Sequence, residues 1–271
     1  MHMPDERQLC EMPPFCRLVP QQLRDALDLA EARHFTGGAV VFDEGQPGRR
    51  FHLLLSGHIR FVRLTAAGEQ IIVLHIPAGQ MFGIGAALGQ VTHQATAIAA
   101  GNCRVLSWPN ALWPVFTRKY DGFSAETLRA FGAQADEMSD RIVELSTKVV
   151  EQRIACALLR MIGQSGRKVA AGIEIGFPIS RQNIADMTGT TLHTVSRLLS
   201  AWEKQGLVES SRCHVVVTDP HRIVMLSGAA ERTAGGNPVR PSYDADMADA
   251  RSAARKVASS SPYSRQASIT V

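Results

Sequence analysis

The stretch Ser180–Val208 reads SRQNIADMTGTTLHTVSRLLSAWEKQGLV, and it decides how the rest of the chain is interpreted. Ala185, Gly189 and Val195 have the spacing of two short helices joined by a tight turn. A small side chain at Ala185 lets the helices approach each other, and Gly189 tolerates the positive φ that the turn favours. Val195 then lies on the inner face of the second helix. This pattern predicts a helix-turn-helix, whose second helix enters the major groove of DNA.

The composition of the 271 residues suits a DNA-binding protein and does not indicate a membrane-spanning or secreted protein. The formal net charge is +4, and no uncharged apolar run reaches the length of a membrane span, so no membrane partner is expected. The N-terminus has no apolar core and does not predict a secretory signal. Five cysteines at irregular spacing do not predict a disulfide framework, so we expect a cytoplasmic protein.

The first half of the chain predicts a β-rich domain. Residues 1–17 form a Pro-rich lead-in that we expect to be mobile, and Leu18–Arg33 has the spacing of an amphipathic helix. Turn glycines then recur at intervals of 12, 11 and 11 residues, with short apolar runs between them. This regularity predicts an antiparallel β-roll of about eight strands within a sensor domain at residues 18–120.

A heptad pattern follows the predicted β-roll. Apolar residues repeat from Leu128 to Val149 at alternating steps of three and four. The pattern predicts a long dimerisation helix at residues 121–149 that pairs with a second copy of the chain, although packing against the chain's own β-roll is an alternative. The predicted dimer seam consists of Leu128, Phe131, Ala135, Met138, Ile142 and Leu145.

Residues 150–226 predict a winged helix-turn-helix domain. A helix that includes Ile154 and Ile162 opens this domain, Gly163–Gly172 is expected to be a loop, and Ile173–Ile179 a short strand pair. After Gly206, the run LVESSRCHVVV predicts a β-hairpin, the wing. Residues 227–271 are rich in Ser, Ala, Gly and Arg and are expected to be disordered.

This order of parts resembles the CRP/FNR family of transcription regulators. The resemblance rests on Phe42-Asp-Glu-Gly45, Leu54-Leu-Ser-Gly57, Pro77-Ala-Gly-Gln-Met-Phe82, and SRQNIA with TVSRLL in the opening stretch. It implies an α+β fold with an N-terminal cyclic-nucleotide-binding-type β-roll, a long dimerisation helix and a C-terminal winged helix-turn-helix. It also implies a homodimer on a pseudo-palindromic DNA operator, with RNA polymerase as a further partner.

The second helix of the motif supplies the candidate DNA contacts. Thr191 is expected to cap it, and His193, Ser196 and Arg197 share its exposed face. Arg197 is the candidate for a bidentate contact with guanine, as the resemblance also implies. His193 stands where many relatives carry a Glu, so the recognised half-site is expected to differ there. The candidate phosphate contacts are Arg181, Thr190 and Thr191.

The sequence argues against two of the signals and cofactors that relatives use. Relatives that bind cyclic AMP hold its ribose with a Glu and its phosphate with an Arg, but Ile84 and Gln94 occupy these positions, so cyclic AMP is not expected. A 4Fe-4S cluster needs four thiolates, and this sensor region has only Cys10, Cys16 and Cys103. Cys103, Cys156 and Cys213 are interpreted as structural residues.

The sequence Thr190–Glu203, TTLHTVSRLLSAWE, looks most like the NnrR branch, which implies nitric oxide or low oxygen as the signal and respiratory genes as the target. Haem is the cofactor that this resemblance suggests. The sequence does not identify which residue would bind the haem iron. The candidate histidines are His34, His52, His58, His75 and His93. A ligand-independent regulator, or one that responds to redox change through thiols or an iron–sulfur cluster, is the alternative. No metal triad of a cupin and no nucleophile motif is present, so an enzyme is not expected.

Overall fold

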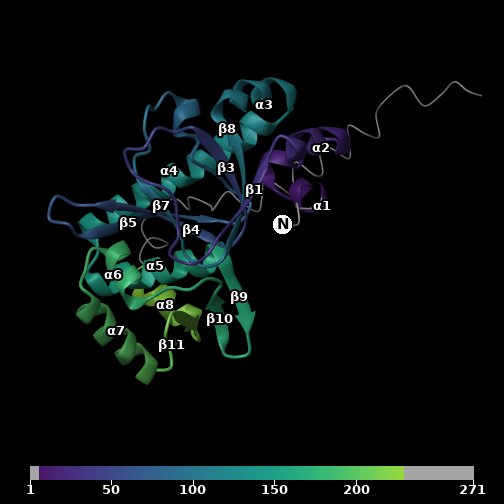
Figure 1. The fold of residues 1–271 in the computed structure, drawn as a ribbon. Helices are drawn as coiled ribbons and strands as arrows, with labels where there is room; N and C mark the ends of the chain where they lie inside the picture. Colours follow the sequence, from purple (N-terminus) through teal and green to yellow (C-terminus); the bar gives the residue numbers. More distant parts are fainter. Residues whose placement is uncertain (1–5, 229–271) are drawn as a thin grey trace, which may run out of the picture. The chain divides into compact units, whose positions relative to one another are not determined.

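The computed structural model describes residues 6–228 of the chain, and Figure 1 shows how their helices and strands are arranged. The predicted disordered tail lies outside the described residues from position 229 onward. The described helices, with 3-10 turns written η, are α1 (Glu6–Cys10), η1 (Pro13–Phe15), α2 (Pro20–Asp28), η2 (Ile84–Leu88), η3 (Asn110–Leu112), α3 (Trp113–Lys119), α4 (Phe123–Thr147), α5 (Val150–Ser165), α6 (Arg181–Thr188), α7 (Leu192–Lys204) and α8 (Pro220–Leu226).

Two antiparallel four-stranded sheets form the predicted β-roll, in the strand orders β1-β8-β3-β6 and β2-β7-β4-β5. Their inner faces meet in an apolar core that includes Phe42, Leu54, Ile59 and Val105. This arrangement confirms the predicted fold class of the first half. The strands are β1 (Glu31–Phe35), β2 (Val40–Phe42), β3 (Arg50–Ser56), β4 (His58–Leu64), β5 (Gln70–Pro77), β6 (Met81–Phe82), β7 (Thr96–Ala99) and β8 (Cys103–Pro109).

The N-terminal segment differs from its prediction in two ways. The lead-in is structured where it is described: Leu9 and Phe15 are fully buried, and the ring of Phe15 stacks on Trp108 of β8. The helix predicted for Leu18–Arg33 ends at Asp28, and Glu31–Phe35 instead forms β1. Pairing of β1 with β8 supplies backbone hydrogen bonds that outweigh the local helical pattern.

Helix α4 follows the heptad pattern up to Thr147 and leaves most of the predicted seam exposed. Leu128, Met138, Ile142 and Leu145 are between 44% and 65% exposed in the single chain. Val149 does not extend the helix, because it adopts an extended conformation as the residue before α5. The apolar face of α4 therefore has no cover within the described part of the chain over most of its length.

The C-terminal part of the described chain is a winged helix-turn-helix. The wing consists of β11 (Val208–Ser211) and β12 (His214–Val217), which join β10 (Gly172–Ile175) and β9 (Gly166–Val169) in the sheet β11-β12-β10-β9. The prediction of a loop at Gly163–Gly172 was wrong, because pairing between β9 and β10 turns part of this polar segment into a hairpin. Helices α5, α6, α7 and α8 pack around one apolar core with this sheet.

No helix described within residues 6–228 combines sufficient length with sufficient hydropathy to cross a bilayer.

Candidate functional site

The first helix of the motif, α6, has well-defined ends. Ser180 caps its N-terminus: its hydroxyl accepts a hydrogen bond from the backbone N–H of Asn183, and the Asn183 side chain accepts from the Ser180 N–H. At the other end, Gly189 has φ of 60°, as the sequence predicts for the turn. Ala185 is 1% exposed, so the two helices meet closely at this small residue.

An arginine that is distant in the sequence also supports the turn between the helices. The sequence did not predict this contact. The guanidinium of Arg153 on α5 donates hydrogen bonds to the carbonyls of Thr188 at 2.9 Å and Gly189 at 3.3 Å. These carbonyls lie at the end of α6, where the helix leaves acceptors unpaired and its dipole favours a positive charge. Arg153 therefore fixes the angle at which α7 begins.

The second helix, α7, separates a buried face from an exposed one. Thr191 caps it as predicted, with its hydroxyl accepting a hydrogen bond from the N–H of Thr194. Val195 is fully buried and packs in the core of this domain. The side chains of His193 and Arg197 are exposed on the opposite side, and Ser196 is half-buried.

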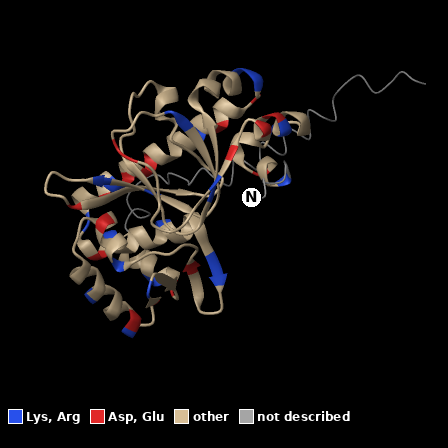
Figure 2. Ribbon diagram, in the orientation of Figure 1, with Lys and Arg blue, Asp and Glu red and all other residues tan. Residues whose placement is uncertain are grey.

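The predicted phosphate contacts occupy different environments. Thr191 is exposed and Thr190 is half-buried. The guanidinium of Arg181 is held within the domain, because it forms an ion pair with Glu203 at 3.2 Å and donates to the Ser210 hydroxyl at 2.9 Å. Further basic positions lie along α7 and on the outer strand β9 (Figure 2), where both Arg167 and Lys168 are exposed.

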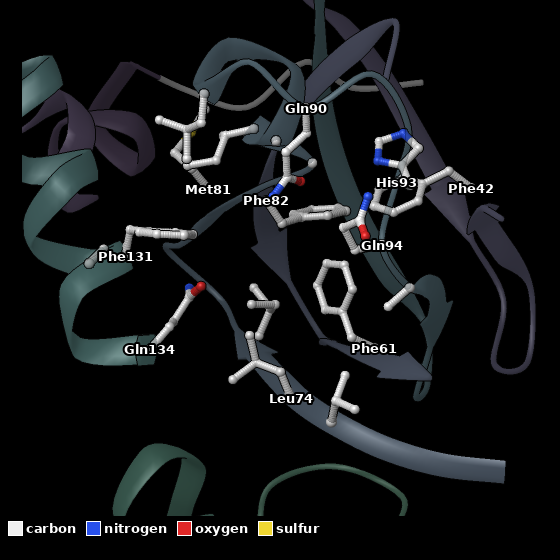
Figure 3. Close-up of a pocket in the computed structure, with 18 of the residues that line it drawn as sticks. Phe42, Phe61, Leu74, Met81, Phe82, Gln90, His93, Gln94, Phe131 and Gln134 are labelled. Carbon is white, nitrogen blue, oxygen red and sulfur yellow. The ribbon is translucent and has the colours of Figure 1, made fainter. Parts of the chain in front are cut away.

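A second candidate site is a cavity of about 180 Å³ between the β-roll and α4 (Figure 3). Four phenylalanine rings line it, from β2, β4, β6 and α4. Aliphatic and methionine side chains complete most of its wall, with glutamines, a threonine and a histidine among them. The lining includes Phe42, Phe61, Phe82, Ile84, His93, Gln94, Thr127, Phe131, Gln134 and Met138.

The residues of this cavity do not fit a cyclic nucleotide. The described lining residues include no Lys, Arg, Asp or Glu. Ile84 and Gln94, which the sequence places where relatives hold the ribose and the phosphate, both line the cavity. The single ionisable group is His93, whose pKa is lowered by burial, so its imidazole is uncharged near neutral pH. A cyclic phosphate would therefore lie in a low-dielectric site with no opposite charge.

The cavity does not fit a haem in its present form either. Of the five candidate histidines, the described cavity wall includes only His93, whose ring stacks on Phe42 with 3.7 Å between ring centres. A cavity of roughly 150 Å³ holds one benzene molecule, and a tetrapyrrole is several times larger than benzene. His52 is engaged elsewhere, through a 2.7 Å hydrogen bond with Ser107. Within residues 6–228, no group of three or more His, Cys, Asp or Glu side chains could hold a metal ion.

Two of the five cysteines lie in the core, as the sequence predicts for them. Cys103 and Cys156 are buried, and burial raises the pKa of both thiols. Cys213 lies in the wing turn, with φ of 64°. Cys10 and Cys16 are exposed, and each thiol donates to the carbonyl three residues earlier in the chain.

One buried arginine connects the helix that lines the cavity with the helix-turn-helix. The guanidinium of Arg141 on α4 donates to the carbonyls of Ile72 at 2.8 Å and Met187 at 2.9 Å, and also to the carbonyl of Val73. Ile72 and Val73 belong to β5, and Met187 belongs to α6. Arg141 therefore joins α4 to the backbone of both β5 and α6.

Two family models match the chain at these two sites. Residues 32–117 match the cyclic nucleotide-binding domain, and residues 152–225 match the Crp-like helix-turn-helix domain. The chain belongs to the CRP/FNR family. It is a DNA-binding transcription regulator of the type that responds to signals, and its relatives are regulators rather than enzymes.

Individual CRP/FNR relatives agree with this assignment. The electron transport regulator A of Shewanella oneidensis is 26% identical over 71% of this chain and 77% of its own length. The nitrogen fixation regulation protein FixK of Bradyrhizobium diazoefficiens is 26% identical over 79% of this chain and 93% of its own length. The solved structure of FixK2 from Bradyrhizobium japonicum has the same fold, with a TM-score of 0.64 and 23% identity over 73% of this chain and 96% of that one. The NnrR branch stays a prediction.

Proposed function

We propose that this CRP/FNR regulator reads its operator with the exposed face of α7. In this proposal Arg197 binds a guanine through O6 and N7, while His193 and Ser196 contact neighbouring bases. The observation that carries the proposal is the exposure of His193 and Arg197 on the side of α7 opposite the buried Val195. The regulator acts in the cytoplasm and activates transcription through contact with RNA polymerase.

The test compares operator and scrambled duplexes, with the operator selected from random DNA by the wild-type protein. Arg197→Ala is expected to reduce the ratio of the two affinities by about ten- to a hundredfold, as loss of a bidentate base contact does. Lys204→Ala is the matched control, because Lys204 is an exposed cation in the last turn of the same helix. An unchanged ratio for Arg197→Ala would contradict the assignment.

The phosphate contacts of this proposal are Arg181, Thr190 and Thr191. Loss of a phosphate contact weakens binding to all sequences alike, and loss of a cationic one also reduces the slope of log affinity against log salt by about one. Arg181 must exchange its partner Glu203 for a phosphate, so Arg181→Ala is expected to give a smaller slope change than a free arginine would. Equal weakening on operator and scrambled duplexes separates this role from base reading.

The proposal includes a homodimer that pairs through α4. The exposed apolar positions Leu128, Met138, Ile142 and Leu145 support it, because an apolar face of this length is rarely left in water. A twofold dimer presents its two recognition helices to half-sites about one DNA turn apart, which matches a pseudo-palindromic operator.

For the signal, the first candidate is nitric oxide or low oxygen acting on respiratory genes. The name of the Shewanella electron transport regulator supports a respiratory target. Haem is the cofactor that this candidate implies, although the residues and volume of the cavity do not fit a haem. The absorption spectrum of anaerobically purified protein tests this candidate, because a haem protein, an iron–sulfur protein and a colourless protein have different spectra.

Two other candidates follow from separate observations. Exposed Cys10 and Cys16 support a thiol-based redox response, which mass spectrometry of the oxidised protein would detect as a disulfide or oxidised thiol. The apolar cavity supports an organic effector instead. A regulator without any effector would keep one operator affinity under all of these conditions.

A further inference from the structure

We infer that the cavity between the β-roll and α4 binds a small, uncharged aromatic molecule of one or two rings that carries a hydrogen-bonding group. This inference rests on the proposed regulator function and specifies the class of its effector. Figure 3 shows the cavity, with Phe131 and Gln134 reaching into it from α4 and Phe61, Phe82 and His93 facing them from the β-roll.

The lining favours an aromatic ligand. The rings of Phe42, Phe61, Phe82 and Phe131 lie around the cavity, and aromatic rings prefer stacked or edge-on contact with other rings. Phe42 stacks on His93 at 3.7 Å, and Phe61 meets Phe82 edge-on. A flat molecule therefore finds ring faces or edges on several sides.

The electrostatics of the lining favour an uncharged ligand. The described walls include no Lys, Arg, Asp or Glu, and His93 is uncharged near neutral pH. An ionised phosphate or carboxylate would lose its hydration without gaining an opposite charge. A neutral molecule avoids this cost.

The volume sets the size of the ligand. The cavity measures about 180 Å³, slightly more than the roughly 150 Å³ in which one benzene molecule is held in a protein core. One ring, or two fused rings at the open side of the cavity, is accommodated with the side chains as they stand.

A buried hydroxyl provides the point at which the ligand is recognised. Thr127 lines the cavity and is 2% exposed, and its Oγ1 has no hydrogen-bond partner among the described residues. A buried hydroxyl without a partner is unfavourable, and a ligand group that donates to it or accepts from it removes this penalty. The other polar group from α4, Gln134, already donates to Gln80 at 2.9 Å. The ligand's polar group is therefore expected to meet Thr127.

The position of Thr127 also connects the ligand with the DNA-binding domain. Thr127 lies on α4, and so do the cavity residues Phe131 and Met138, which belong to the predicted dimer seam. Further along the same helix, Arg141 contacts β5 and α6. A ligand that draws α4 toward the β-roll therefore acts on the seam and on the helix-turn-helix together.

The experiment measures binding of 2-naphthol and of naphthalene to the full-length protein by calorimetry or ligand fluorescence. 2-Naphthol is uncharged at pH 7, has two rings and carries one hydroxyl. We expect one molecule per chain. Thr127→Val keeps the shape of the side chain and removes its hydroxyl, so 2-naphthol should bind about three- to tenfold more weakly and naphthalene should bind equally well.

The folding of the Thr127→Val protein is checked by circular dichroism and by operator binding without ligand, which the inference expects to be unchanged. Cyclic AMP at millimolar concentration should not displace 2-naphthol. Ala155→Gly on α5, outside the cavity, is the control variant and should leave both affinities unchanged.

Several results would overturn the inference. These are failure of both 2-naphthol and naphthalene to bind the wild-type protein, equal weakening of both ligands in Thr127→Val, or displacement of 2-naphthol by cyclic AMP. Stoichiometric uptake of haem with a Soret band that excludes 2-naphthol would also overturn it and would support the gas-sensing candidate. If the wild-type protein does not bind any operator specifically, the proposed function is contradicted, whereas the ligand measurements are still interpretable.

Discussion

The imidazole of His58 in β4 stacks on the ring of Phe177, with 4.1 Å between the two ring centres. Phe177 lies between β10 and α6, so this contact joins the β-roll to the segment that leads into the helix-turn-helix. His75 in β5 faces the same ring at 5.2 Å. Neither imidazole has a hydrogen-bond partner among the described residues, so both pack as neutral rings.

These two histidines predict a loss of stability in acid. Burial lowers the pKa of His58 to about 4, and burial together with nearby His58, Arg141, Arg60 and Arg160 lowers that of His75 to about 3. In the unfolded chain each titrates near 6.5, so the unfolded state binds more protons below that pH. The free energy of unfolding should be highest above pH 6.5 and decrease as the pH falls toward 4, by up to about 1.4 kcal/mol per pH unit for each histidine.

Urea unfolding between pH 7.5 and 5 measures this dependence. His58→Phe keeps a ring against Phe177 and should reduce the slope by the contribution of one histidine. His34→Gln is the control, because His34 is exposed on β1, and it should leave the slope as it is. An unchanged slope in His58→Phe would show that His58 is protonated equally in the folded and unfolded states.

Two turn glycines predict different costs of substitution. Gly57 and Gly68 both have positive φ, at 90° and 79°. A Cβ at Gly57 would lie 2.5 Å from the carbonyl oxygen of Asn102 and 2.7 Å from the thiol sulfur of Cys103, whereas a Cβ at Gly68 meets nothing within 4 Å. Gly68→Ala should therefore cost about 1 kcal/mol of conformational strain. Gly57→Ala should cost clearly more, because the turn between β3 and β4 must move away from the start of β8.

Thermal and urea unfolding of both variants check this difference. Both substitutions change the unfolded chain in the same way, so the difference between them reports the folded state alone. Equal costs would mean that the loop containing Asn102 yields without loss of pairing.

Arg141→Met should destabilise the protein strongly. The substitution removes a buried guanidinium and leaves the carbonyls of Ile72, Val73 and Met187 without this donor. Unpaired buried polar groups cost about 1–3 kcal/mol each before relaxation, so a loss of at least about 2 kcal/mol in the free energy of unfolding is expected. Burial lowers the pKa of Arg141, because its charge is partly desolvated.

Arg63→Met is the matched control for this prediction. Arg63 pairs with Glu44 at 3.1 Å on the surface, where the arginine side chain is 57% exposed. Exposed ion pairs contribute between 0 and about 1 kcal/mol, so this variant should remain close to wild type. If both variants lose the same stability, the three carbonyls find other donors when Arg141 is absent.

The features that could be predicted from the sequence are those that depend on residues close together in the chain. Thr191 caps α7 through the N–H three residues later, and Gly189 adopts the positive φ of the turn, because both depend on neighbours in the chain. Arg153 and Arg141 were missed for the opposite reason. Their carbonyl acceptors are 35 and 69 residues away, at Thr188 and Ile72, and no local pattern marks such pairs.

Errors in the predicted elements have a related cause. Glu31–Phe35 continues a helical pattern but pairs with β8, and Gly166–Val169 is polar but pairs with β10. In both segments, hydrogen bonds to a distant strand outweigh local preference. The cavity could be predicted only in part: Ile84 and Gln94 indicated a change of ligand, while the unpaired hydroxyl of Thr127 emerges only from the packing of α4.

The exposed seam on α4 predicts that one charge abolishes the dimer. Ile142 is 65% exposed in the single chain and lies in the C-terminal half of the predicted seam. In a twofold dimer each substitution occurs twice, so Ile142→Glu removes two apolar contacts and places two like charges close together. Burial of each isoleucine contributes about 1.5–3 kcal/mol, so the dimer dissociation constant should rise by at least about a hundredfold.

Sedimentation equilibrium over a range of concentrations measures this change, and operator affinity should fall with it, because a monomer contacts only one half-site. Val91→Glu is the control: Val91 is 82% exposed in a loop outside the seam, so it receives the same charge without facing the partner. The Val91 variant should remain a dimer with wild-type operator affinity. A dimeric Ile142→Glu protein, or a wild-type protein that is monomeric at micromolar concentration, would show that α4 does not pair the two chains.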